Sequence, residues 1–454
     1  MRPFIAVLVV ALFAALQPAA AAASPLKAGV ARVDITPPIG LTMYGYGGRK
    51  AGATGVRDPL MARVLVLEAG ETRIAFVGLD LGEPPAFEWV KRLRENAAAS
   101  SAISYVLVTA THTHSGPDIR PAYPAGAPPD WESDALAKIG RAIDDAHQHA
   151  IESRIGTGYG RVLIGHNRLR LEPDGTISWF ERNNTMTPTS PVDPVVSVLR
   201  LDTTDGTPIA ILVNYACHPV VFGPDNLQYS TDFPGVTEAV IERELGGMAM
   251  FLQGGDGDIN PFYAVHPLDQ DAPRWKDWTG DRLGREATRV AKSIRTLAVS
   301  DAHLDVAEDV LDFRPRWKRE PFVSAVRRDS GDAQADVADR WYTEGMHAPV
   351  ATILINKRIA FMTVPGEPFV DYQIDWRNRC PVEDAFFLGY ANVSLGYFPT
   401  IRAASLGGYG AGNMATAIQP DAGARIVDHA IVKIYEMLGK LTDLPEELRE
   451  KRRD

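Results

Sequence analysis

The chain has 454 residues, of which 45% are hydrophobic and 23% are charged, values typical of a soluble globular protein. Its formal net charge is −10, and it has no basic face with interleaved aromatic residues, which argues against nucleic acids and acidic membrane surfaces as partners. The two cysteines, Cys217 and Cys380, are too few for a disulfide framework, although a single bridge between them is possible.

The first residues have the pattern of a cleaved secretory signal. Arg2 supplies a positive start, residues 4–16 form an apolar run, and residues 19–23 offer small-residue cleavage sites. The run is too short to span a bilayer, and no later segment has the pattern of a transmembrane helix. We therefore predict a signal peptide over residues 1–23 and a mature protein that is periplasmic or secreted.

The rest of the chain alternates apolar runs with amphipathic stretches, which predicts an α/β (mixed α+β) fold with central mixed β-sheets flanked by helices. Strands are expected, in chain order, over residues 31–38, 61–67, 73–79, 105–110, 195–201, 208–214, 249–253, 351–355, 358–364 and 385–389. Helices are expected over residues 132–153, 235–246, 279–299 and 420–440. Residues 302–348 are more charged and less periodic, which suggests a peripheral insertion or a cover over a site. Without repeats or low-complexity linkers, residues 24–454 are expected to form one domain.

Polar side chains capable of catalysis follow several of these strands within a few residues. They are His112, His114, His218, Asp256, Asp258, Glu367 and Tyr397. Strand ends in one sheet face the same rim, so we expect these residues to converge there. Neutral imidazole is the commonest protein metal ligand, and a His-x-His pair can place one ring on a metal and the other on substrate. The alternative is that the two histidines merely fall together near the turn at Gly116 and Pro117.

Five short motifs, taken together, resemble the neutral/alkaline (non-lysosomal) ceramidase family. They are residues 111–117 (THTHSGP), 217–219 (CHP), 257–261 (GDINP), 364–367 (VPGE), and the stretch from Gly389 to residues 397–400 (YFPT). Weaker matches are residues 34–38 (DITPP), 58–60 (DPL) and 167–168 (NR). The motifs run in the family's order over most of the mature chain. The resemblance implies an enzyme that cleaves an N-acyl amide with a single Zn²⁺ ion.

The resemblance also implies roles for individual residues. The zinc ligands would be His112, His218, Glu367 and Tyr397. The residues beside the scissile group would be His114, Arg168 and Tyr409. Two nitrogens and a carboxylate suit Zn²⁺, and a phenolate is an unusual but hard oxygen ligand. An always-charged planar guanidinium could hold an oxyanion or a substrate carboxylate. The alternatives are a surface salt bridge for Arg168, a helix-start carboxylate for Glu367 and a packing role for Tyr397.

The sequence departs from the family at Asn260, which stands where the family has a nucleophilic serine. A carboxamide cannot form an acyl-enzyme, so we predict attack by zinc-activated water. His114 or Asp258 would then act as general base and acid, and Asn260 could donate a hydrogen bond to an oxyanion. A second possible nucleophile is Ser115, whose alternative role is a capping hydroxyl. The catalytic motifs reach close to the end of the chain, so the family's extra C-terminal domain is not expected here.

We therefore predict a zinc-dependent amidohydrolase that acts on a small-molecule or lipid-like substrate, with an ester as the next most favoured bond. Two other functions stay open. One is a zinc enzyme of another reaction type on the same site, such as an esterase or a carbohydrate-directed eliminase. The other is a non-catalytic binding protein that keeps the metal for structure. The sequence leaves the oligomeric state open.

Overall fold

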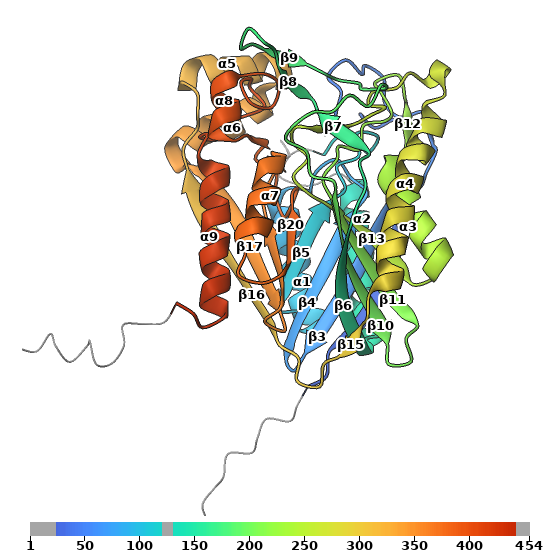
Figure 1. Ribbon diagram of the computed structural model, residues 1–454. Coiled ribbons are helices and arrows are strands. Elements are labelled where there is room, and N and C mark those ends of the chain that lie inside the picture. The colour runs from blue at the N-terminus through green and yellow to red at the C-terminus, as the bar shows by residue number, and fades with distance from the viewer. Residues whose placement is uncertain (1–23, 120–129, 442–454) are drawn as a thin grey trace, which may run out of the picture.

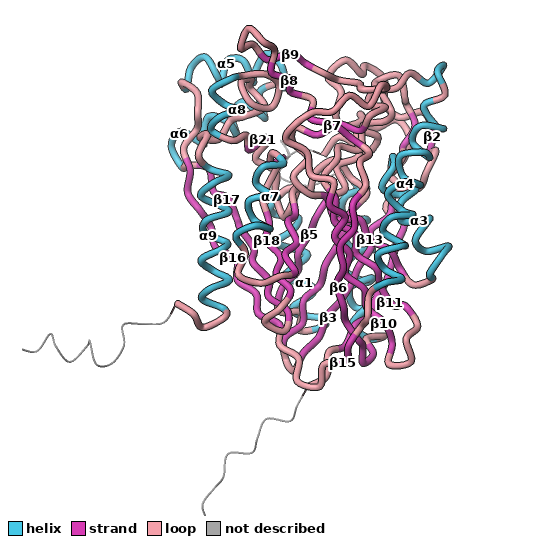
Figure 2. The backbone as a smooth tube through the Cα atoms, viewed as in Figure 1, coloured by secondary structure: helices cyan, strands magenta, loops and turns pink. Residues whose placement is uncertain are grey.

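A computed structural model describes residues 24–119 and 130–441 and shows the expected α/β fold (Figure 1). Two β-sheets pack face to face in the centre, and helices cover their outer faces (Figure 2). The predicted signal peptide, residues 1–23, lies outside the described residues. None of the described helices is long and apolar enough to cross a membrane.

Within the described residues, the larger sheet is mixed and has nine strands in the order β13-β11-β10-β6-β1-β3-β4-β5, with β15 beside β6. The bounds are β1 (Lys27–Asp34), β3 (Met61–Ala69), β4 (Thr72–Leu79), β5 (Tyr105–Ala110), β6 (Ile151–Arg161), β10 (Val195–Thr203), β11 (Pro208–Tyr215), β13 (Met248–Gln253) and β15 (Leu297–Ala298). The strands β4 and β5 pair in parallel, as do β11 and β13, whereas the remaining neighbours are antiparallel.

The smaller sheet has the order β16-β17-β18-β20. Its strands are β16 (Leu304–Phe313), β17 (Met346–Ile355), β18 (Ile359–Thr363) and β20 (Asp384–Leu388), and β18 and β20 are parallel. Shorter two-stranded pieces are β2 (Gly55–Val56) with β12 (Gln228–Tyr229), β7 (Gly165–Asn167) with β14 (Ile259–Pro261), β8 (Leu169–Leu171) with β9 (Ile177–Trp179), and β19 (Glu367–Pro368) with β21 (Tyr397–Phe398).

The core of the molecule lies between the two sheets. Phe76 and Leu107 from the larger sheet pack in one cluster with Phe361 and Phe386 from the smaller sheet. Side chains alternate along a strand, so the neighbours of Leu107 point the other way and join a second cluster beneath the helices α1 (Phe87–Ser101) and α2 (Asp130–Gln148). Burial on both faces explains why β5 is a continuous apolar run.

Helices complete the outer layers. Besides α1 and α2, the helices α3 (Asp232–Leu245) and α4 (Ala272–Ser293) cover the outer face of the larger sheet. A short 3₁₀ turn over Leu268–Gln270 precedes α4. The smaller sheet is covered by α7 (Val370–Arg379) and α9 (Ala422–Met437), and α8 (Ile401–Leu406) lies above them in Figure 1. Residues 302–348 contribute the sheet strand β16 and a hairpin of α5 (Arg319–Ser330) and α6 (Asp332–Glu344). This segment is therefore partly core and partly periphery.

Two predicted helices have the wrong bounds. The helix expected over residues 132–153 ends at Gln148, and residues 151–161 form β6 instead. Glycines at 156, 158 and 160 hid this strand, because glycine disfavours strands. The structure explains why glycines are present in this strand. A Cβ at Gly158 would lie 2.8 Å from Ile294 Cγ1, so the absence of side chains on this face of β6 allows the end of α4 to pack closely against it. The helix expected over residues 279–299 runs instead from Ala272 to Ser293, with a proline in its first turn.

The parallel strand pairs bring many strand ends to one edge of the fold. Strands β4, β5, β11 and β13 of the larger sheet and β18 and β20 of the smaller sheet end there (Figure 1). Near this edge, the buried Gln253 amide Nε2 donates to the carbonyls of Thr111 and Cys217, at 3.1 and 3.0 Å. This side chain ties together the two loops that carry His112 and His218.

The two cysteines, Cys217 and Cys380, do not form a disulfide bond in the structure, and both are free thiols.

Candidate metal centre

His112 lies on the loop after β5, with a positive φ of 69° and a fully buried ring. Its Nδ1 lies 2.6 Å from the carbonyl oxygen of Gly82, to which it donates. The Tyr390 ring stacks on the imidazole, with ring centroids 4.0 Å apart. Because Nδ1 carries the proton, the lone pair of Nε2 faces the interior of the site.

His218 is held in the same way after β11. Its Nδ1 donates to the carbonyl oxygen of Asp256 at 2.6 Å, and its Nε2 has no hydrogen-bond partner. Both Nε2 atoms point at one carboxylate oxygen: Glu367 Oε2 lies 3.5 Å from His112 Nε2 and 3.4 Å from His218 Nε2. This oxygen is also buried without a hydrogen-bond partner. A buried carboxylate facing two nitrogen lone pairs is an arrangement that a cation would satisfy.

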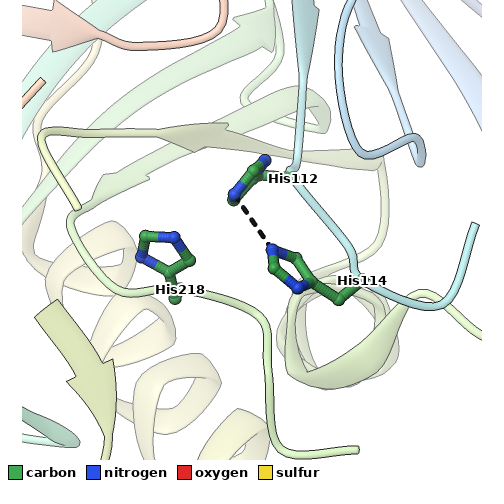
Figure 3. A group of neighbouring side chains, drawn as sticks. All are labelled: His112, His114 and His218. Atoms are coloured by element: carbon green, nitrogen blue, oxygen red, sulfur yellow. Dashed lines mark hydrogen bonds between the residues drawn. The ribbon is translucent and has the colours of Figure 1, made fainter. Parts of the chain in front are cut away.

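His114 completes a three-histidine cluster. Figure 3 shows the rings of His112, His114 and His218 around a common space, and their possible ligand atoms all lie within 4.8 Å of one another. The Nε2 atoms of His112 and His114 are 3.2 Å apart. The cluster could therefore hold a metal ion. Two imidazole nitrogens and a carboxylate form a donor set that suits zinc.

Burial keeps these histidines neutral. Desolvation lowers the pKa of His112 to about 3, although the nearby Glu367 carboxylate opposes the shift. Burial also holds the pKa of His114 and of His218 well below the ordinary value. Metal binding requires the neutral imidazole, so the protein holds the rings in the protonation state that a metal needs.

Tyr397 lies beside Glu367, because β19 and β21 pair in parallel with these two residues in register. Its hydroxyl is hydrogen-bonded to the Glu367 side chain, and Arg168 Nη2 donates to it at 2.9 Å. Burial raises the pKa of Tyr397 well above its usual value, and Arg168 opposes that shift. The phenol oxygen therefore lies at the same carboxylate as the two histidines, with a guanidinium behind it.

Arg168 is buried behind the histidine cluster. Its Nη1 donates to Asn260 Oδ1 at 3.0 Å, and its Nη2 donates to the Gly257 carbonyl at 2.8 Å. Its Cζ lies 5.0 Å from the centroid of Trp179 and 5.4 Å from that of Tyr409, whose rings are about half exposed. No carboxylate forms an ion pair with it among the described residues. Arg168 is thus a buried cation fixed by neutral acceptors and aromatic faces.

The polar side-chain atoms of Asn260 and Asp258 already have hydrogen-bond partners within the protein. The Asn260 amide accepts from Arg168 and donates through Nδ2 to the Glu181 carbonyl at 2.9 Å. The Asp258 carboxylate accepts from Asn167 Nδ2 at 2.6 Å and from the Val370 backbone N–H at 2.9 Å. Burial raises the pKa of Asp258 to about 7. Both side chains thus tie together segments around Arg168 and at the start of α7.

Three contacts in the site were not predicted from the sequence. Tyr44 places its ring edge-on to His112 and His114, at 5.6 and 5.3 Å between centroids. Tyr390 stacks on His112 and donates to Asp256 Oδ1 at 2.6 Å. The Gly82 carbonyl orients His112. Two sequence features could have indicated the tyrosines: residues 41–48 are rich in Gly and Tyr, and Tyr390 directly follows a predicted strand. No sequence pattern indicates that the carbonyl of Gly82 orients His112.

Substituting alanine for Gly45 should displace His114. This glycine has a φ of +101°, and an added Cβ would lie 2.3 Å from His114 Nδ1. A shift of about 1 Å in a catalytic group can lower a reaction rate about 10²-fold, and we expect a loss of that order in the protein's activity. The matched control is Gly47→Ala, because a Cβ there meets nothing within 4 Å. Equal rates for the two variants would contradict the proposed role of His114.

Comparison with known proteins places this site in a family. Residues 26–266 match the family model for the N-terminal part of neutral/alkaline non-lysosomal ceramidases, so the chain belongs to that family. It is 24% identical over 268 residues to a neutral ceramidase of Mycobacterium tuberculosis, covering 53% of this chain and 40% of the relative. It is 26% identical over 275 residues to a neutral ceramidase of Pseudomonas aeruginosa, covering 56% of this chain and 40% of the relative. The match thus spans less than half of either relative's length.

The fold extends the resemblance beyond the matched sequence. The crystal structure of neutral ceramidase from Pseudomonas aeruginosa superimposes with a TM-score of 0.73 at 18% identity, covering 93% of this chain and 76% of that chain. A ceramidase complexed with C2 gives a TM-score of 0.72 at 19% identity, with 93% and 77% covered. The chain therefore has the ceramidase fold over nearly all of its length.

Proposed function

We propose that this protein is a zinc-dependent hydrolase that cleaves the amide bond of a lipid-like N-acyl substrate. The observation that carries the proposal is the approach of one Glu367 oxygen to two buried imidazole nitrogens, at 3.5 and 3.4 Å, in a member of the ceramidase family. Two relatives are named neutral ceramidases, and one similar structure is a ceramidase complexed with C2, which supports a lipid-like amide as substrate.

The zinc ligands in this proposal are His112, His218, Glu367 and Tyr397. A zinc ion supplies Lewis-acid chemistry, which polarises a carbonyl and acidifies water. The chain's part is to fix the ligands: two backbone carbonyls set the tautomers of the histidines, and Arg168 holds the phenol oxygen of Tyr397. Tyr409, beside Arg168 and about half exposed, lies where a substrate can reach it.

Proton transfer falls to His114 in this proposal. Its ring is neutral, its Nδ1 is buried without a partner, and its Nε2 faces His112. Asp258 was the other candidate, but both of its carboxylate oxygens already accept hydrogen bonds. Asn260 likewise has its carboxamide held at both ends. We therefore propose that water is the nucleophile and that Asn260 positions Arg168.

The test is hydrolysis of long-chain N-acyl amides in water enriched with ¹⁸O. Amide hydrolysis adds one solvent oxygen to the released carboxylate, which mass spectrometry detects, whereas elimination adds none. We expect labelled carboxylate and free amine in equal amounts, with chelator-treated protein as the control. Ester cleavage without amide cleavage, or an unlabelled unsaturated product, would contradict amide specificity. Bound metal without turnover on either class would favour a binding protein.

Export and domain organisation also remain proposals. The charge, apolar run and alanine cluster of residues 1–23 support a cleaved signal and a periplasmic or secreted protein. The shared core between the two sheets supports a single domain over residues 24–454. Mass spectrometry of the N-terminus of exported protein tests the first proposal, because an intact Met1 would contradict cleavage.

A further inference from the structure

A cavity outside the metal centre lies beneath α6. It consists of two adjacent spaces of about 400 and 230 Å³, which share the lining residues Glu83, Val337, Trp341, Ser394 and Leu395. We call the two spaces together the α6 cavity. The larger space alone falls within the range of small-molecule sites in proteins.

The walls of the α6 cavity are mostly hydrocarbon. The larger space is lined by Pro84, Pro85, Val310 and Val393 in addition to the shared residues. The smaller space runs under the α5–α6 hairpin between Phe322, Val326, Ala338 and Met414. An apolar space of this size suits a flexible hydrocarbon chain, whose transfer from water gains about 0.8 kcal/mol for each buried methylene.

A carboxylate without a cation lies where the two spaces meet. Glu83 Oε1 accepts from Ser394 Oγ at 2.7 Å, and the Tyr44 hydroxyl also donates to this carboxylate. No lysine, arginine or histidine pairs with Glu83 among the described residues. Burial raises the pKa of Glu83 to about 7, and a cation beside the carboxyl would favour its ionised form. An anion in an apolar site is costly unless a cation or further donors reach it.

The charges at the cavity mouth also favour a positive ligand. Glu88 and Glu344 are exposed there. The basic side chains of the lining are Arg340 and His347, and His347 is paired with Asp312 at 2.7 Å. Glu308 also lines the larger space, but Arg94 neutralises it through two hydrogen bonds of 2.9 and 2.8 Å. The acidic side chains at the opening therefore favour a positively charged ligand, as the inner carboxylate of Glu83 does.

We propose that the α6 cavity binds a primary amine with a linear hydrocarbon chain, with the ammonium on Glu83 and Ser394 and the chain beneath α5 and α6. A fatty acid of the same length would place its carboxylate against Glu83 and is excluded by like charge. The inference rests on the proposed function in one respect: amide hydrolysis of an N-acyl lipid releases such an amine. Binding itself requires no catalysis.

The polar end of the cavity is close to the metal centre. Tyr44 spans the two, because its hydroxyl contacts Glu83 while its ring lies against His112 and His114. Glu83 also directly follows Gly82, whose carbonyl orients His112. An amine held at Glu83 would thus lie one side chain away from the histidine cluster.

The test is calorimetric titration of dodecylamine at pH 8.5, below the concentration at which it forms micelles. The protein is used in its zinc-loaded form and as His218→Ala, so that binding is measured with and without an intact metal site. We expect saturable binding of one amine in both forms. Affinity should rise about fourfold for each methylene from hexylamine to dodecylamine. Dodecanoate should bind at least about tenfold more weakly.

Variants locate the site. Glu83→Gln should weaken dodecylamine binding about 10- to 100-fold, because it removes a charge-assisted hydrogen bond. Val337→Trp should abolish the dependence on chain length by filling the space. The matched control is Glu95→Gln, an exposed carboxylate on α1 outside the cavity, which should bind as the parent does. Thermal melting checks that each variant is folded.

Three outcomes would overturn the proposal: unchanged affinity in folded Glu83→Gln, equal binding of dodecanoate, or no dependence on chain length. Failure of the amidase proposal has a different signature. In that case no amide is cleaved in ¹⁸O water, while dodecylamine still binds to both the zinc-loaded protein and His218→Ala.

Discussion

Replacing His218 with alanine should remove the bound metal and lower amide hydrolysis by about 10³-fold or more. His218 is fully buried, its Nδ1 is committed to the Asp256 carbonyl, and its Nε2 faces Glu367 at 3.4 Å. Alanine leaves no nitrogen in that position, and no other histidine of the cluster can replace it without breaking its own contacts. Metal content by mass spectrometry and the hydrolysis rate are measured on the same sample.

The matched control for this substitution is His149→Ala. His149 is an exposed histidine just after α2, and its ring interacts with Asp145 on the same helix. Its loss should change neither metal content nor rate. Full metal occupancy in His218→Ala would refute the ligand assignment, whereas loss of metal with full activity would refute the metal's part in the reaction.

Substituting Asn260 should give the next largest effect. Asn260→Ala frees Arg168 Nη1 and the Glu181 carbonyl, and we expect a loss of about 10²–10³-fold in rate because Arg168 is no longer fixed. Asn260→Ser introduces the residue type that the family resemblance assigns to this position. Its hydroxyl can donate and accept at once, but the side chain is shorter, and we expect it not to reach both Arg168 and the Glu181 carbonyl. We therefore expect it to be impaired like Asn260→Ala rather than improved.

Intact-mass analysis during turnover separates positioning from nucleophilic catalysis. With water as the nucleophile, no acylated protein accumulates in the parent or in Asn260→Ala, and serine-directed reagents leave the parent active. The alternative nucleophile is Ser115, whose Oγ accepts from Asn226 Nδ2 at 3.0 Å. An acyl group trapped on Ser115 would contradict direct attack by water. It would leave the metal ligands unaffected.

The strand-end histidines show what could be predicted from the sequence. The apolar run over residues 105–110 is β5, with the same bounds, and His112 follows it at the edge where the parallel strands end. This prediction succeeded because burial on both faces leaves a continuous hydrophobic pattern and because parallel strands end on one side of a sheet. The strands β3 and β4, which are antiparallel, were predictable because they too are buried along most of their length and form continuous apolar runs.

Other parts of the fold and the site left no local signal. The strand β6 is rich in glycine because α4 packs against it, a constraint imposed by residues more than a hundred positions away. The orientation of His112 depends on the carbonyl of Gly82, and that of His218 on the carbonyl of Asp256. The amide of Gln253 joins the two histidine loops. Such contacts depend on tertiary packing, which a single sequence does not encode as a pattern.

The central claim, that the buried cluster of His112, His218 and Glu367 holds a catalytic zinc ion, is tested most directly by a zinc titration. The protein is stripped with a chelator, desalted and titrated with zinc while amide hydrolysis is followed. We expect activity to be absent in the stripped protein, to rise linearly and to saturate at about one zinc ion per chain. Full activity in the stripped protein, or activity that does not respond to added zinc, would contradict this claim.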